Sequence, residues 1–140
     1  MTSGTVRAQK GAYACPDVPA TFDIHRLTEG TTLIIVAGSI DYADVKAMIA
    51  VVAVPLSGEQ DLVISFAQCT LIDIGAIRIC ERVVDMLAPG QCFVVVIDDR
   101  NASYELFFRD RAPVRVTCAP TISAAVRTID RQRQTELTGT

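Results

Sequence analysis

The 140-residue sequence contains no tryptophan, a single histidine and no long apolar stretch. Its longest nearly uncharged apolar run, at residues 47–56, has about half of the roughly 20 residues that a membrane-spanning helix needs. Residues 1–20 also lack the apolar segment of a secretory signal. We therefore expect a soluble protein that resides in the cytoplasm and has no membrane partner.

The sequence also has no excess of positive charge. The formal net charge is −3, the isoelectric point is about 5.0, and the sequence contains no run of lysine or arginine. Proteins that bind nucleic acids carry basic patches that neutralise phosphates. A nucleic-acid partner is therefore not expected.

The sequence carries no motif of catalysis or cofactor binding. His25 is the single histidine, and no triad or metal-binding cluster is visible for it to join. Neither a glycine-rich phosphate loop nor a paired-carboxylate motif is present. We expect no enzymatic activity, no cofactor and no bound metal.

The five cysteines are an odd number, and none of them has CxxC or CxxH spacing. They are Cys15, Cys69, Cys80, Cys92 and Cys118. This pattern argues against a zinc site or a disulfide framework, so the internal cysteines are expected to be small buried hydrophobes. We expect Cys92 and Cys118 at opposite ends of neighbouring parallel strands, about 15 Å apart, beyond the roughly 7 Å limit for a disulfide. Cys69 and Cys118, one strand apart, should be about 9–10 Å from each other. Cys15 could reach an exposed thiol, which leaves redox control open as a minor possibility.

The composition predicts one well-packed domain. Half of the residues are hydrophobic, and the mean hydropathy is +0.34. Residues 1–20 mix glycine, proline, hydroxyl and charged side chains without periodicity and are interpreted as a flexible leader. Residues 21–132 form the domain. Residues 133–140 have no packing pattern and are expected to fray.

Periodicity in the first half predicts a hairpin and then a helix. Residues 22–27 alternate between apolar and polar, residues 31–38 are more uniformly apolar, and turn residues lie between them. Asp41 is placed to cap a helix over residues 43–52, which Pro55 should limit.

The second half alternates between strand and helix patterns. The expected elements are strands at 62–66, 92–97 and 114–117, helices at 74–87 and 102–109, and a final helix capped by Thr121. The order β-β-α-β-α-β-α-β-α predicts an α/β fold. It should have a single mixed, mostly parallel sheet of about five strands with four helices.

This order, with the residues at its corners, resembles the STAS domain of bacterial anti-sigma factor antagonists. Gly38-Ser39-Ile40-Asp41 matches the Gly-x-Leu/Ile-Asp corner of that family. The apolar strand at 62–66, followed by Ile72-Asp73, matches its strand and Asp-Ser-Ser-Gly motif. Residues 92–118 match its ending of strand, short helix and strand. The resemblance covers about residues 22–130 and implies a STAS-like fold.

The resemblance also implies a phosphorylation switch that this sequence lacks. In bacterial members, a kinase that is also an anti-sigma factor phosphorylates the serine or threonine after the aspartate, and the unphosphorylated form binds the anti-sigma factor and frees the sigma factor. Here Ile74, Gly75 and Ala76 follow instead, so neither family position carries a hydroxyl. The nearest hydroxyls, Thr70 and Ser39, are minor candidates for modification, and a capping or solvated role is the ordinary interpretation of both.

By this resemblance, the partner is an anti-sigma factor or a related kinase-like regulator, bound near the two corners. The candidate partner-binding residues are Ser39, Asp41, Asp73, Ile74, Gly75, Ala76, Arg78, Arg82 and Phe107. The alternative function is that of a divergent STAS scaffold or a small-ligand sensor with a non-sigma partner. The oligomeric state is left open.

Several of these residues also have a structural interpretation. Asp73 can simply cap the helix that follows it, and Gly75 can reflect tight packing. Arg78 and Arg82, with Glu81 and Asp85, have the spacing of a solvated helix face held by i,i+3 and i,i+4 pairs. Phe107 lies in a run of three large apolar residues, one of which a short helix would leave exposed.

Overall fold

The computed structural model describes residues 3–7, 20–28, 30–40, 42–72, 74–97 and 116–139. Within these ranges, only the backbone is described for residues 3–7, 28, 42, 70–72, 74 and 136–139. The expected helix at 102–109 and the cysteine at position 15 lie outside the described residues.

The described strands form a single mixed sheet in the order β1-β2-β3-β4-β5-β6. The strands are β1 Ser3–Arg7, β2 Thr21–Thr28, β3 Thr31–Ile40, β4 Asp61–Ile72, β5 Phe93–Val96 and β6 Thr117–Ala119. β1, β2 and β3 are antiparallel neighbours, whereas the pairs from β3 to β6 are parallel. The predicted class, an α/β fold with a mixed and mostly parallel sheet, is confirmed.

β1 is a strand that the sequence did not predict, and it adds a sixth strand to the five expected. It lies inside the supposed flexible leader and pairs with β2, Ser3 opposite His25 and Arg7 opposite Thr21. The prediction of a structureless segment is therefore wrong for residues 3–7. An edge strand is held by backbone hydrogen bonds, which need no apolar pattern in the added strand.

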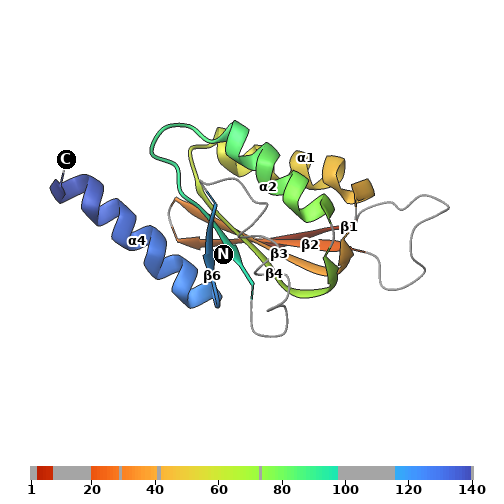
Figure 1. Ribbon diagram of the computed structural model, residues 1–140. Coiled ribbons are helices and arrows are strands. Elements are labelled where there is room, and N and C mark those ends of the chain that lie inside the picture. Colours follow the sequence, from red (N-terminus) through yellow and green to blue (C-terminus); the bar gives the residue numbers. More distant parts are fainter. Residues whose placement is uncertain are drawn as a thin grey trace.

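The helices cover both faces of this sheet (Figure 1). They are the 3-10 turn η1 Tyr42–Asp44 and the α-helices α1 Val45–Ser57, α2 Ile74–Met86 and α4 Ile122–Gly139. α1 and α2 lie side by side on one face, and α4 crosses the other. Successive right-handed crossovers from β3 to β4 and from β4 to β5 place their helices, α1 and α2, on the same face.

Two apolar cores result, one on each face of the sheet. The core beneath α1 and α2 contains the largest side chains, among them Phe22, Phe66 and Met48, all completely buried. The core beneath α4 is smaller and includes Val94, Ala125 and Ile129.

α2 is buried more fully than one helix face predicts. Ile77 and Cys80, one helical turn apart, are buried, but so are Ile79 and Val83. The extra burial arises because α2 packs against α1 as well as against the sheet. A helix that packs against one neighbouring element buries a single apolar face, whereas α2 packs against two and buries more of its surface.

Pro55 does not end α1, contrary to the prediction. The helix continues to Ser57, and the backbone N–H of Gly58 then donates to the carbonyls of Val54 and Pro55 at 3.3 and 3.1 Å. Proline lacks one N–H, so near a C-terminus it removes a single hydrogen bond of the helix. The following residues satisfy the last carbonyls.

The C-terminal segment is helical rather than frayed. α4 runs to Gly139, and its start is capped as predicted, with the N–H of Ala124 donating to Thr121 Oγ1 at 3.0 Å. The expected fraying of residues 133–140 is wrong for residues 133–139. The sequence pattern could not show that Arg133 is bound to a distant strand.

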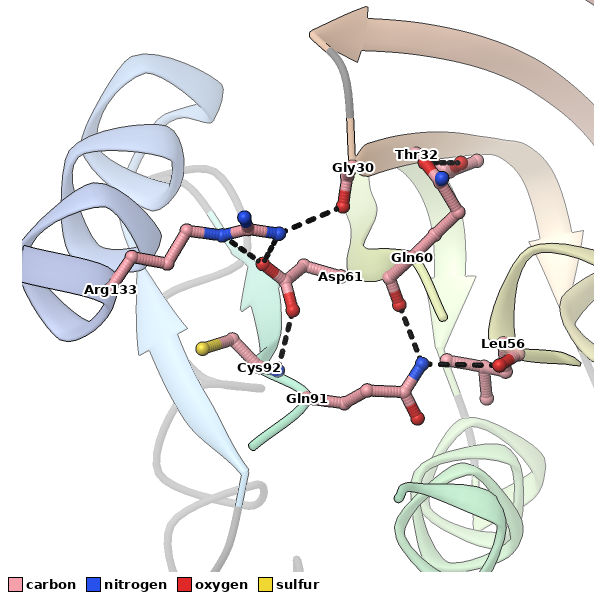
Figure 2. Close-up of polar contacts among 8 residues, drawn as sticks. All are labelled: Gly30, Thr32, Leu56, Gln60, Asp61, Gln91, Cys92 and Arg133. Atoms are coloured by element: carbon pink, nitrogen blue, oxygen red, sulfur yellow. Dashed lines mark hydrogen bonds and ion pairs between the residues drawn. The ribbon is translucent and has the colours of Figure 1, made fainter. Parts of the chain in front are cut away.

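Arg133 belongs to a polar network at the amino-terminal edge of the parallel strands (Figure 2). Arg133 forms an ion pair with Asp61 and donates through Nη2 to the Gly30 carbonyl at 3.2 Å. The other carboxylate oxygen of Asp61 accepts the Cys92 N–H at 2.9 Å. Gly30 has a φ of 94°, and a Cβ there would lie 2.9 Å from Arg133 Nη2, so both backbone conformation and space favour glycine.

Gln91 completes the network from the loop between α2 and β5 (Figure 2). Its Nε2 donates to the carbonyls of Leu56 and Gln60 at 3.1 and 2.9 Å, and its Oε1 accepts the Ala88 N–H at 2.7 Å. One side chain thus joins the end of α1, the start of β4 and the loop that leads into β5. The side-chain amide of Gln91 therefore has a structural role, because its hydrogen bonds go to the protein's own backbone.

Candidate functional site

The two corner motifs of the sequence lie side by side in the structure. β3 and β4 are parallel neighbours, so both carboxyl ends reach the same edge of the sheet. Ser39 lies opposite Leu71, and Ile40 lies opposite Ile72. The register shifts between Gly38 and Ser39, where Gly38 has a φ of 85° that side chains disfavour.

The second corner leads directly into α2. The helix begins at Ile74, and the next two residues, Gly75 and Ala76, are buried. η1, which follows β3, packs against α2. The residues that replace the hydroxyls of the resembled motif are therefore part of a packed helix start.

Buried polar groups support this corner from beneath. Ser39 is only 5% exposed and Asp44 is completely buried. The Cys69 thiol donates to the Val36 carbonyl at 3.6 Å. Burial raises the pKa of Cys69 to about 12, and the charge of Asp44 adds to the rise.

Comparison with known proteins gives matches of fold alone. No protein-family model and no curated protein matches the sequence. Among solved structures, an anti-sigma factor antagonist from Mycobacterium paratuberculosis superimposes with a TM-score of 0.63 at 19% identity, over 79% of this chain and 94% of that chain. The chain has the STAS fold. The anti-sigma factor antagonist SpoIIAA, in its unphosphorylated form, superimposes with a TM-score of 0.58 at 16% identity, over 80% of this chain and 97% of that chain.

Within this STAS fold, the predicted site residues fall into three groups. Ser39, Gly75 and Ala76 are buried at the corner, whereas Arg78 and Arg82 are exposed on the outer face of α2. For Thr70 and Ile74 the backbone alone is described, and it places both at the corner. Asp41, Asp73 and Phe107 lie outside the described residues.

The exposed face of α2 forms one of the ion pairs that its sequence spacing predicted. Arg78 Nη1 donates to Glu81 Oε2 at 3.2 Å, an i,i+3 pair with both side chains substantially exposed. Such surface pairs contribute about 0.2–1 kcal/mol, so the pair is solvated and adds little stability. Arg82 makes no ion pair among the described residues.

Sequence reasoning missed two residues near this corner. Asp44, the second residue of the helix expected at 43–52, instead occupies the N-cap position of α1, makes no side-chain cap hydrogen bond there, and is buried near Cys69. Its position just before Val45 was the available signal, because acidic residues favour helix starts. Lys46 gave no signal beyond being one of two lysines, and it lines a groove between α1 and α2.

The described part of the chain holds no group of three histidine, cysteine or acidic side chains arranged to bind a metal. Within the same residues, no helix is long and apolar enough to cross a bilayer.

The four described cysteines are free thiols, and the structure corrects both predicted separations. Cys118 is level with Val95 and Ile64, so Cys69 lies five β4 positions farther along and is well beyond the expected distance of about 9–10 Å from Cys118. Cys118 lies opposite Val95, in the middle of β5, because β6 begins later than expected. Cys92 therefore precedes it by three strand positions, about 10 Å rather than about 15 Å, which is still too far for a disulfide.

We predict that the thiols of Cys69 and Cys80 react with an aromatic disulfide reagent only when the chain unfolds. Burial raises the pKa of both, and the neighbouring Cys118 and Glu81 raise that of Cys80 further. The reactive thiolate is therefore scarce near neutral pH. Labelling at pH 8 with and without urea, followed by peptide mass spectrometry, measures this. Cys118, which is half-buried, is the internal comparison, and rapid labelling of Cys80 in native buffer would contradict the prediction.

The raised pKa of Cys69 also affects the stability of the fold at high pH. The folded chain retains the Cys69 proton up to about pH 12, whereas the unfolded thiol ionises from its ordinary value of 9.0. This contribution to stability is therefore complete below pH 9 and is lost as the pH rises toward 12.

Proposed function

We propose that this chain is an anti-sigma factor antagonist-like regulator. It binds an anti-sigma factor, or a related kinase-like regulator, by protein–protein contact. The STAS fold and the adjacent ends of β3 and β4 support this proposal, because the resembled family uses that corner for its partner. The protein acts in transcription regulation, in the cytoplasm of a bacterium and without enzymatic activity of its own.

The observation that carries the finer proposal is the start of α2. The helix begins Ile74-Gly75-Ala76, with no hydroxyl where the resembled family is phosphorylated. Phosphorylation there would add about −1.5 to −2 charges next to the partner. Ser39, a nearby hydroxyl, is buried beneath the corner, which limits access for a kinase. We infer that binding at this corner has no phosphate off-switch.

The proposed partner surface combines the corner with the exposed face of α2. It comprises Ser39, Asp41, Asp73, Ile74, Gly75, Ala76, Arg78, Arg82 and Phe107. Buried Gly75 and Ala76 shape the backbone, and exposed Arg78 and Arg82 supply the polar contacts.

The test is direct binding to the purified anti-sigma factors of the organism that makes this chain. Calorimetry should find a partner whose affinity changes less than about twofold after incubation with ATP, because no phosphate is added at this corner. Mass spectrometry after the incubation should find the chain unmodified. The matched variant is Ile74→Ser, which restores a hydroxyl and should gain phosphate and lose affinity.

Two results would overturn the proposal in different ways. Absence of binding to every anti-sigma factor would remove the function. Phosphate on the unaltered chain would contradict the inference that the chain has no phosphate off-switch. The next candidate positions would then be Thr70 and Ser39.

A second candidate function is small-ligand sensing, and one hollow favours it. A shallow depression of about 670 Å³, widely open to solvent, lies between the α2–β5 loop and α4. It is lined by Gln91, Cys92, Thr128 and Arg131, among others. Native mass spectrometry of the purified chain would reveal a retained small molecule if this function holds. A non-sigma protein recovered by affinity capture, with no ligand, would instead favour the scaffold alternative.

A further inference from the structure

A groove is lined by residues of α1 and α2. These two helices lie side by side on one face of the sheet (Figure 1). Its lining consists of Ala43, Val45, Lys46 and Ile49 from the η1–α1 segment and Arg82 from α2. The groove has a volume of about 410 Å³. Ala43 belongs to η1, which follows β3 and packs against α2, so this end of the groove lies on the side of the corner described above.

The floor of the groove is apolar. Val45 and Ile49 lie one helical turn apart on α1, and both are half-buried against the core. A half-buried pair of this kind still offers apolar surface to an incoming side chain. The apolar floor alone would not select one partner, because many apolar side chains could pack on it.

The rim adds a charge preference, because it carries two exposed cations from different helices. Lys46 rises from α1 and Arg82 from α2. Neither forms an ion pair with a described residue, whereas the nearby Arg78 is neutralised by Glu81. Among the described residues that line the groove none is acidic, so this part of the groove is positively charged. Two like charges facing one groove repel each other until an anion lies between them.

We propose that this groove receives an acidic, amphipathic segment of the protein partner. An apolar side chain of that segment packs on Val45 and Ile49, and a carboxylate lies between Lys46 and Arg82. The apolar floor distinguishes such a segment from a free anion, which would use the cations alone. This inference rests on the proposed function and names the chemistry of its partner.

The test uses the purified anti-sigma factor that binds the full chain. The double variant Lys46→Glu/Arg82→Glu should lower affinity by at least about tenfold, because the attraction becomes repulsion. Wild-type affinity should also fall as salt is raised, and less so in the variant. The matched control, Arg26→Glu/Arg127→Glu, makes the same charge change at exposed positions outside the groove and should bind within about twofold of wild type. Circular dichroism checks that each variant is folded.

The outcomes separate the two proposals. If wild type binds and the Lys46/Arg82 variant binds equally well, the groove assignment is overturned and the proposed function stands. If both double variants weaken binding to the same extent, the effect is one of net charge and the groove assignment is again overturned. If no anti-sigma factor binds the wild-type chain, the proposed function fails and the groove assignment falls with it.

Discussion

Replacing Arg133 with alanine is expected to lower the free energy of unfolding by about 2–4 kcal/mol. The side chain of Asp61 is 4% exposed, and Arg133 is its charged partner, with Nε donating at 2.6 Å. Without Arg133, the carboxylate keeps only the Cys92 N–H as a described donor. A buried charge that loses its partner is costly, and the partial exposure of Arg133 places the effect toward the lower end of the usual range.

Urea denaturation followed by circular dichroism measures this effect. Arg131→Ala is the matched control, because it removes the same side chain from an exposed position of the same helix and should change stability by less than about 0.5 kcal/mol. A double-mutant cycle with Asp61→Asn should give a coupling of at least about 1 kcal/mol. Equal stabilities of the two arginine variants would show that the anchor contributes nothing.

Replacing Phe66 with alanine is expected to cost about 3–5 kcal/mol, the largest effect that we predict. Phe66 is on β4, is completely buried, and belongs to the core beneath α1 and α2. Its removal loses the transfer free energy of the ring and leaves a cavity that the packed helices cannot fill. Single domains are usually stable by only about 5–15 kcal/mol, so the variant should be close to unfolding at room temperature.

Two variants calibrate this result by the same denaturation measurement. Phe66→Leu retains most of the volume and should cost clearly less than alanine. Val54→Ala removes an apolar side chain that is 73% exposed and should be nearly neutral. A Phe66→Ala chain as stable as the Val54→Ala chain would mean that the core tolerates the loss, against the prediction.

The fold could be predicted where the apolar pattern determines it. The β2–β3 hairpin, β4, α2 and β5 lie where the apolar spacing indicated them, and most of their apolar residues are buried. β1 could not be predicted, because its pairing relies on backbone groups that every residue carries. The end of α4 could not be predicted either, because it depends on Asp61, 72 residues earlier in the chain. Local patterns carry no information about such a contact.

The adjacency of the two corners was predictable, whereas the burial of the residues there was not. Chain order alone placed the ends of β3 and β4 at one edge, and their register agrees. Burial of Ser39 and Asp44 could not be inferred, because an isolated polar residue in a sequence is most often exposed. Lys46 and Arg82 face one groove because α1 and α2 are neighbours, which is a property of helix packing.

The ion pair between Asp61 and Arg133 also bears on the order in which the chain is made. Synthesis proceeds from the N-terminus, and domains tend to acquire structure as they emerge. The hairpin of β2 and β3 and the parallel partner β4 are complete long before residue 133 leaves the ribosome. Until then, Asp61 has no cation, and water must remain at the amino-terminal edge of the strands to solvate its charge. α4 therefore supplies the charged partner of Asp61 late, since Arg133 is made 72 residues after Asp61.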